Sequence, residues 1–396
     1  MSMNSSAKLS EKWLKASIIG TVWASSEIVL GSFLHNLKVP FSGSILTAIG
    51  VIILISASYI WSEKGIIWRA GLICALMKTM SPSAVIFGPM IAIFTEALLL
   101  DISVGALGKS YAGFLLGSIL AVSWGFIQKI INYIIFYGFN IVELYKNLMQ
   151  YTENQLNLNF EILWLPLLIL LSVHIFIGIF AAVSGIKTGN KLINRPIEYH
   201  PRTWKNHSLN NNRRLTKDFN YSITSLIINI LLVVVLLVLI SFADWKIWSI
   251  AVTAVAFSWG IKYKRALRQL MKPKFWIFFV LISMLTAFLF TRIQSKPVYE
   301  AILIGLEMNF RATVIILGFS VIGTELYNPR IRNYFNQTRF KQLPVAMELA
   351  TESLPGVIAN IPDFKTIIKN PVTVIYHLIA FADFRLKQIK NSANNN

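Results

Sequence analysis

The sequence predicts an all-α polytopic membrane protein with about ten transmembrane helices, six followed by four, and with cytoplasmic amphipathic helices in its C-terminal part. Hydrophobic residues make up 55% of the 396 residues and charged residues only 14%, and the mean hydropathy is +0.60. An ordinary water-soluble protein does not have this composition. Apolar runs of about 20 residues recur along the chain, and that length crosses a hydrocarbon core of ~30 Å. Lys and Arg gather beside alternate runs, as on the cytoplasmic side of a membrane.

The basic character of the chain indicates contact with lipid. The formal net charge is +19, but the basic residues flank the apolar runs and form no stripe with interleaved aromatic residues. We therefore expect the lipid bilayer as a partner and no nucleic acid. Cys74 is the single cysteine, so one chain can form neither a disulfide nor a thiolate metal cluster, and we expect no metal site.

Ten apolar runs are candidate transmembrane helices. Six lie in the first half of the chain, at residues 14–34, 43–60, 66–77, 84–100, 111–139 and 162–186. Four follow a polar stretch, at residues 221–242, 245–259, 275–290 and 299–323. The third run is short, and a single bent helix formed by the third and fourth runs is the alternative.

The distribution of charge favours ten separate crossings with both termini in the cytoplasm. This topology places 29 of the 37 Lys and Arg residues on inner segments. Merging the third and fourth runs would place the stretch 187–220, with eight basic residues, on the outer side, against the positive-inside bias. We expect a multi-pass protein of the cell membrane, which is the inner membrane where there are two.

The stretch 187–220 is also the clearest domain boundary. It is rich in Asn, Arg and Lys, and its prolines oppose a continuing helix. The sequence predicts a six-helix membrane domain at 1–186, a basic cytoplasmic linker at 187–220, a four-helix membrane domain at 221–323 and cytoplasmic helices at 324–390.

Small residues recur every four positions in two of the runs, which predicts close packing of those helices. In the fifth run this face consists of Gly113, Gly117, Ala121 and Gly125. In the first run it consists of Ala16, Gly20 and Ala24, and it continues to Glu27.

Five residues of the first half are candidate substrate-binding residues: Trp23, Glu27, Lys78, Glu96 and His174. A charged group inside a membrane costs about 3 kcal/mol on insertion scales and usually marks a ligand path or a paired structural site. Lys78 precedes a break that contains Pro82, and such a break frees backbone carbonyls near membrane depth, as in the substrate sites of transporters.

Each of these residues has a structural alternative. Glu27 and Glu96 could be hydrogen-bonded to a neighbouring helix, and Glu96 could also snorkel from the inner end of its run to the interface. His174 shares a stripe with small residues, which favours a hydrogen-bonded histidine within the bundle. Trp23 could stack on an aromatic ligand, although simple packing is the commoner role of such a residue.

Two opposite charges lie within the last apolar run. Glu307 and Arg311 are four residues apart, so in a helix their side chains meet on one face and neutralise each other. Such a pair either joins helices or responds to movement between them. The sequence leaves both roles open, and we place the joining role first.

The chain beyond residue 323 is predicted not to cross again. Its apolar residues have helical spacing, and Pro355 and Pro362 are expected to divide it into short helices. These helices either dock on a protein partner or anchor to the membrane surface.

Both halves of the chain resemble components of one transporter family. The second half resembles the transmembrane (T) component of energy-coupling-factor (ECF) transporters, because an arginine-bearing span, "LIGLEMNFRATVIILGFSVIGTELYNPRI", leads to the Leu-Pro segment "LPVAMELATESLP". The first half is similar to the substrate-binding S component, with six spans and a small-residue face on the first. Its segment "VIFGPMIAIFTEALLL" is similar to part of cobalt and nickel permeases.

The resemblance implies a fused S and T importer of a micronutrient. Two cytoplasmic ATP-binding cassette ATPase subunits would use the ATP, so the chain itself would hold no cofactor and would not be an enzyme. By this resemblance, Arg311 corresponds to the intramembrane arginine of the family, and Ala16, Gly20 and Ala24 correspond to the docking face. Pro344 and Pro355 lie in the segment that corresponds to the coupling helices, and Glu307 is assigned to the same coupling region.

Two departures from the family pattern shape the expected function. The Ala-Arg-Gly signatures with which T components engage ATPases do not occur, and the first twelve residues lack the His-rich motif of metal permeases. A vitamin-like or other small organic substrate is therefore preferred to nickel or cobalt. Two other functions stay open: an ATPase-independent secondary carrier, and a membrane scaffold that docks a partner without transport.

Overall fold

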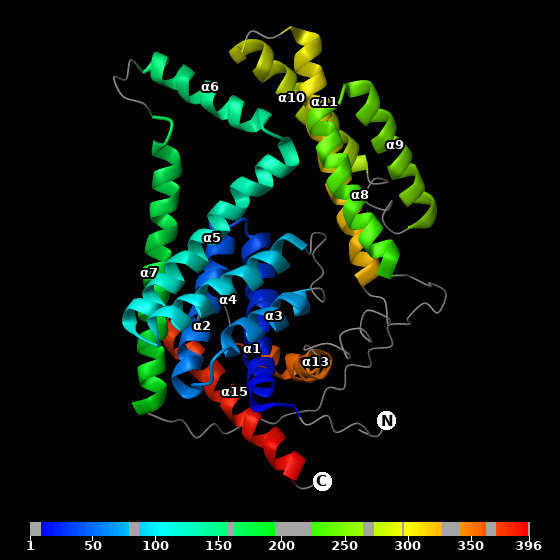
Figure 1. The fold of residues 1–396 in the computed structure, drawn as a ribbon. Helices are drawn as coiled ribbons and strands as arrows, with labels where there is room; N and C mark the ends of the chain where they lie inside the picture. Colours follow the sequence, from blue (N-terminus) through cyan, green and yellow to red (C-terminus); the bar gives the residue numbers. More distant parts are fainter. Residues whose placement is uncertain are drawn as a thin grey trace. The chain divides into compact units, whose positions relative to one another are not determined.

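The computed structural model is all-helical over the residues that it describes (Figure 1). These residues are 9–78, 87–156, 162–194, 223–263, 273–294, 297–326, 341–361 and 370–394. No strand occurs among them, so the predicted all-α class is confirmed for this part of the chain.

The helices are, in chain order, α1 (Glu11–Asn36), α2 (Ser42–Ile60), α3 (Ile66–Met77), α4 (Phe87–Leu107), α5 (Tyr111–Tyr137), α6 (Asn140–Gln155), α7 (Leu165–Asn194), α8 (Ile223–Phe242), α9 (Trp245–Lys262), α10 (Pro273–Gln294), α11 (Val298–Leu326), α13 (Leu343–Ala359) and α15 (Pro371–Asn394).

Seven of the described helices are long and apolar enough to cross a membrane, namely α1, α2, α4, α5, α7, α8 and α11. The chain is therefore a multi-pass membrane protein. The third predicted run forms α3, which is apolar but has only 12 residues. The polar break after it, with Pro82, lies outside the described residues. The count of ten crossings stays a prediction.

The chain forms two compact units. Unit 1 contains Met1–Ile127, Leu170–Leu215 and Tyr334–Asn396, and unit 2 contains Gln128–Ile169 and Thr216–Asn333. Two of the four boundaries between them fall within α5 and α7, and the other two lie outside the described residues. The C-terminal helices are thus grouped with the first half of the chain, whereas the sequence suggested a separate segment. The predicted linker begins inside α7, and its remainder lies outside the described residues.

Helix α1 lies at the centre of unit 1 and contacts α2, α3, α13 and α15. Gly20 faces α3 so closely that a Cβ atom placed there would lie 2.9 Å from the carbonyl oxygen of Ala70 and 2.9 Å from Ile73. Ala16 and Ala24 are buried as well. The small-residue face of α1 therefore packs inside its own unit, and part of it rests on α3.

The small-residue face of α5 packs closely over only part of its length. A Cβ atom at Gly117 would lie 2.7 Å from Leu100 of α4, and one at Gly178 of α7 would lie 2.8 Å from the Cα atom of Ile119 on α5. At Gly125 no described atom lies within 4 Å of the same position. The predicted close packing is confirmed at Gly117 and is wrong at Gly125, where the helix has no close neighbour on that side.

The C-terminal helices cover the core of unit 1. Figure 1 shows α13 and α15, at the red end of the colour scale, beside the blue helices α1 and α2. The buried residues of α13 follow helical spacing: Leu343, Ala346, Ala350, Leu354 and Val357. Helix α15 adds Ile375, Phe381 and Leu386 to the same core. These helices therefore contribute to the stability of the first bundle through apolar burial.

The expected division of the tail at Pro355 is wrong. Helix α13 runs through Pro355 to Ala359, because Leu354 and Val357 are buried on either side of the proline. The missing amide costs one helical hydrogen bond, and this packing outweighs the loss. Pro344 occupies the first turn of α13, where a proline is well tolerated. Pro362 lies outside the described residues.

Unit 2 contains α6 and α8 to α11. Figure 1 shows α8 beside α9 and α10 beside α11. Asn309 of α11 donates to the carbonyl oxygen of Phe279 at 3.0 Å and to Ser283 Oγ at 2.7 Å, which ties α11 to α10. Helix α6 was not predicted. It is amphipathic, with no buried residue, and therefore lacks the apolar length by which the transmembrane runs were recognised.

Candidate functional site

A buried ion pair joins α1 to the end of α3 in unit 1. Lys78 Nζ donates to Glu27 Oε2 at 3.1 Å, and both side chains are less than 10% exposed. Gly31, one helical turn after Glu27, lies beside the lysine, because a Cβ atom there would be in ordinary van der Waals contact with Nζ at 3.8 Å. An isolated buried charge is costly, so each of these groups depends on the other.

Glu96 of α4 is the second carboxyl group in this region. It is 4% exposed and accepts a hydrogen bond from Thr47 Oγ1 of α2 at 2.9 Å. Helix α3 contacts both α1 and α4, so Glu27 of α1, Lys78 at the end of α3 and Glu96 of α4 lie on helices that pack together. We call Glu27, Lys78 and Glu96 the charge cluster. The snorkelling interpretation of Glu96 is wrong, because protein encloses its side chain.

Trp23 packs beside the charge cluster as a core side chain. Its indole is buried and fills the space above Gly50 of α2, where even a Cβ atom would overlap the ring. The ring also lies 3.5 Å from the Cβ position of Gly71 on α3. Its Nε1 is buried and has no hydrogen-bond partner among the described residues. In this conformation neighbouring helices occupy the indole faces that a ligand would need.

His174 is buried elsewhere in unit 1. It is 1% exposed, its Nδ1 lies 2.7 Å from the carbonyl oxygen of Leu170, and its ring contacts Phe126 and Phe41. No hydrogen bond, ion pair or ring contact among the described residues joins it to the charge cluster. Its Nε2 is buried without a partner in the same part of the chain. The expected bundle histidine therefore has one of its two ring nitrogens hydrogen-bonded.

Helix α1 meets α13 on the face next to its small-residue face. Thr21 Oγ1 donates to the carbonyl oxygen of Ser17 in its own helix at 2.7 Å and lies 3.2 Å from the carbonyl oxygen of Ala350 on α13. Ser10 Oγ donates to Gln342 Oε1 at 2.7 Å. Thr21 follows Gly20, so one helix presents Gly20 to α3 and Thr21 to α13. The segment of the predicted coupling helix thus rests on the helix that carries the predicted docking face.

Glu307 and Arg311 form the predicted pair within α11 of unit 2. Arg311 Nε donates to Glu307 Oε1 at 3.2 Å, and the spacing of four residues brings the two groups together as expected. The pair also reaches other helices. Arg311 Nη2 donates to Ser241 Oγ of α8 at 2.7 Å, and Asn140 Nδ2 of α6 lies 3.5 Å from Glu307 Oε2.

Gly138 gives the Arg311 guanidinium its space. The backbone there has φ 73°, in the left-handed region, and a Cβ atom would lie 3.1 Å from the central carbon of the guanidinium. The arginine is therefore enclosed by residues of α8, α11 and the turn between α5 and α6. These contacts support the helix-joining role.

Sequence reasoning missed a third buried carboxyl group, that of Glu325. It lies at the end of α11 and is fully buried, and its Oε1 accepts hydrogen bonds from Ser225 at 2.7 Å and Asn229 at 3.0 Å, both on α8. Tyr263 also donates to it. Its Oε2 has no hydrogen-bond partner among the described residues. The residue was overlooked because the predicted span stopped at residue 323, whereas α11 continues to Leu326.

The spacing of Ser225 and Asn229 was the available signal for this network. The two polar residues stand four positions apart at the start of a strongly apolar helix, so they share one face. A polar pair on an otherwise apolar helix indicates a buried polar partner on another helix.

The described residues hold no group of three or more His, Cys, Asp or Glu side chains that could bind a metal ion. Comparisons of this chain with protein-family models, with curated proteins and with solved structures found no match.

Proposed function

We propose that this chain is a membrane transport protein that takes up a small organic nutrient, such as a vitamin, and that unit 1 holds the solute. The charge cluster supports this proposal. Ionisable groups buried among membrane helices usually mark a solute or ion pathway. Lys78 ends the described part of α3, and Glu27 and Glu96 offer acceptors to a solute that displaces the lysine.

We further propose that uptake is driven as in ECF transporters, by ATPase subunits that bind the chain in the cytoplasm. The observation that carries this proposal is the packing of α13 on α1. Force applied to the C-terminal helices would reach α1 directly, and with it Glu27 of the charge cluster. The gathering of Lys and Arg residues beside the helices supports a cytoplasmic location of both termini.

The test is uptake and copurification in the organism's own membranes. The full chain, tagged at its N-terminus, should recover ATPase subunits, and a small organic compound should be found in the purified protein by mass spectrometry. Uptake of that compound should stop when ATP is depleted. A folded chain that recovers neither a compound nor an ATPase would contradict the proposal.

The coupling step can be tested separately with one substitution. Thr21→Val removes the hydroxyl that contacts Ala350 and that also donates to Ser17 in its own helix, and it keeps the volume of the side chain. Thr313→Val, on α11, is the matched control, because it removes the same kind of bond within a helix, to Asn309, and its hydroxyl has no bond to another helix among the described residues. We expect slower ATP-driven uptake in Thr21→Val with unchanged binding of the compound. Equal uptake rates in the two variants would speak against coupling through this contact.

A second candidate is a secondary carrier driven by protons. Glu96 favours it, because its hydrogen bond is with the neutral Thr47 and the charge of Lys78 is taken by Glu27. A buried carboxyl group without its own cation can bind and release a proton during a transport cycle. For a proton-driven carrier, we expect uptake to continue when ATP is depleted and to stop when an uncoupler is added. In Glu96→Gln, uptake should no longer depend on the proton gradient.

A further inference from the structure

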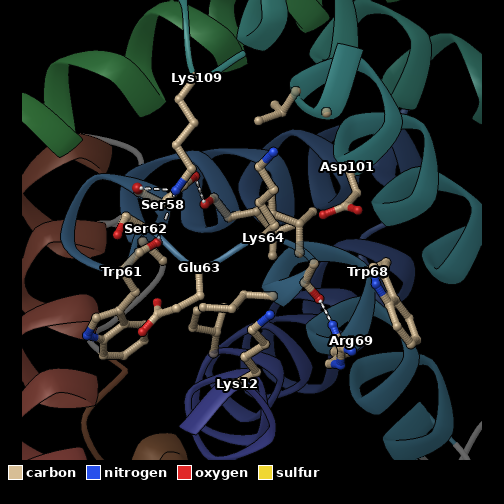
Figure 2. Close-up of a pocket in the computed structure, with 18 of the residues that line it drawn as sticks. Lys12, Ser58, Trp61, Ser62, Glu63, Lys64, Trp68, Arg69, Asp101 and Lys109 are labelled. Carbon is tan, nitrogen blue, oxygen red and sulfur yellow. Dashed lines mark hydrogen bonds between the residues drawn. The ribbon is translucent and has the colours of Figure 1, made fainter. Parts of the chain in front are cut away.

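A cavity of about 570 Å³ opens at one end of unit 1, away from the charge cluster. It lies where α2 ends and α3 begins and where α4 ends and α5 begins, and Lys12 and Ile19 of α1 also line it. Pockets for small molecules have volumes of about 300–1,000 Å³, so this one is large enough for a ligand. Figure 2 shows the labelled polar side chains around this space.

The cavity carries a surplus of positive charge. Four cationic residues line it, Lys12, Lys64, Arg69 and Lys109, against two acidic residues, Glu63 and Asp101. Glu63 already forms an ion pair with Lys15, which does not line the cavity. Burial alone would raise the pKa of Glu63, but the hydrogen bond and charge of Lys15 prevail and lower it. Lys15 thus neutralises the ionised Glu63 although it does not line the cavity. Of the two lining acids, Asp101 is then left to balance the four lining cations.

Three of these cations have charge to offer a ligand. Lys12 and Lys64 make no hydrogen bond or ion pair with any residue in the described part of the chain. Lys109 Nζ donates to the carbonyl oxygens of Ser58 at 2.9 Å and Trp61 at 3.2 Å, which carry no net charge. Burial lowers the pKa of Lys109, and an anion in the cavity would oppose this effect.

Arg69 is held in place with part of its hydrogen-bonding capacity unused. Its guanidinium lies 4.4 Å from the ring centre of Trp68 and 5.4 Å from that of Trp13, and its Nη1 donates to the carbonyl oxygen of Gly65 at 2.8 Å. Its Nε is buried and has no partner among the described residues. A buried donor without an acceptor is costly, and an oriented guanidinium is suited to oxyanions.

The remainder of the lining is apolar. It includes Ile19 of α1, Leu54 of α2, Ile67 of α3 and Val104 of α4. The cavity therefore matches a ligand with an anionic group and an apolar part. Trp13, Trp61 and Trp68 lie around it, and tryptophan is enriched at the level of lipid headgroups.

We propose that this cavity binds the phosphate group of an amphiphilic ligand. A phosphate presents several oxygens in different directions, which suits cations that line one cavity from different parts of the chain. The ligand is either a membrane phospholipid, whose phosphate lies at the interface, or a soluble phosphate ester. This binding does not depend on the proposed transport function.

The test measures thermal stabilisation of the full chain in detergent by three probes. Dioctanoyl phosphatidylglycerol supplies a phosphate with two acyl chains, dioctanoylglycerol supplies the chains alone, and inorganic phosphate supplies the anion alone. Stabilisation by the phospholipid and not by dioctanoylglycerol supports the proposal with a lipid as the source. Stabilisation by inorganic phosphate at similar concentrations supports it with a soluble source.

Two charge-reversal variants locate the binding. Lys64→Glu places an acid in the cavity lining, and Lys187→Glu makes the same change at an exposed residue of α7 in the same unit. Loss of one charge-assisted contact weakens binding by about tenfold or more, so we expect that loss in Lys64→Glu and unchanged binding in Lys187→Glu. Equal binding in both variants, or no stabilisation by either phosphate probe, would overturn the proposal.

Discussion

At the scale of single residues, burial determines which charged side chains need partners. Glu27 is buried against Lys78, and Arg311 against Glu307. The second pair could be predicted because its members are neighbours on one helix. The first could not, because its members are 51 positions apart in the sequence and meet only when α1 packs on α3.

The interdependence of Glu27 and Lys78 predicts a strongly non-additive double-mutant cycle. Glu27→Gln leaves a buried ammonium without its counter-charge and should destabilise unit 1 by about 3–5 kcal/mol. Glu27→Gln combined with Lys78→Met should recover most of that loss, because no uncompensated charge remains. Thermal unfolding in detergent measures both. Additive effects of the two substitutions would show that the groups do not compensate each other.

At the scale of helices, small residues determine how closely backbones approach. The spacing of Gly113, Gly117, Ala121 and Gly125 identified a face of α5, but a face can be longer than the neighbour that covers it. The tail shows the opposite error. Its prolines suggested short surface helices, whereas the apolar stripe of α13 packs on α1 within unit 1 and the helix passes through Pro355.

Gly117 and Gly125 of α5 provide a matched comparison. Gly117→Val inserts a branched side chain against Leu100 and should destabilise the protein by about 1–3 kcal/mol. Gly125→Val makes the same chemical change on the same helix where the space is open, so it should be close to neutral. The melting temperatures of the two variants in detergent give the comparison. A similar loss in both would mean that helix propensity, and not packing, controls this position.

At the scale of the whole molecule, charge asymmetry predicts the orientation in the membrane. Lys64 follows α2 and Lys38 precedes it, and both are exposed in unit 1. Because α2 is long enough to cross, these two loops should face opposite sides of the membrane. The positive-inside bias places Lys64 in the cytoplasm.

Labelling of single cysteines tests this orientation. In a Cys74→Ala background, Lys38→Cys should react with a membrane-impermeant maleimide in intact cells, and Lys64→Cys should react only after lysis. Cys74 itself is buried, so its replacement by alanine removes a background signal without opening the surface. The reverse pattern would invert the orientation, and labelling of both in intact cells would exclude a crossing by α2.

The sequence by itself determined that this is a helical membrane protein. The low polarity of a bilayer requires an apolar composition, and its thickness sets the length of the apolar runs. The sequence also located Glu27, Glu96, Arg311 and the small-residue faces, whose signals are local. Only the tertiary structure decided that Lys78 pairs with Glu27, that Thr21 meets Ala350 and that Glu325 is buried against α8 and Tyr263. These contacts join residues far apart in the chain. The sequence does not show which of its apolar helices pack against each other, because their apolar surfaces are alike. Which helices pack together depends on the fit of their side chains and on the need of each buried polar group for a partner. Both become visible only in the folded structure.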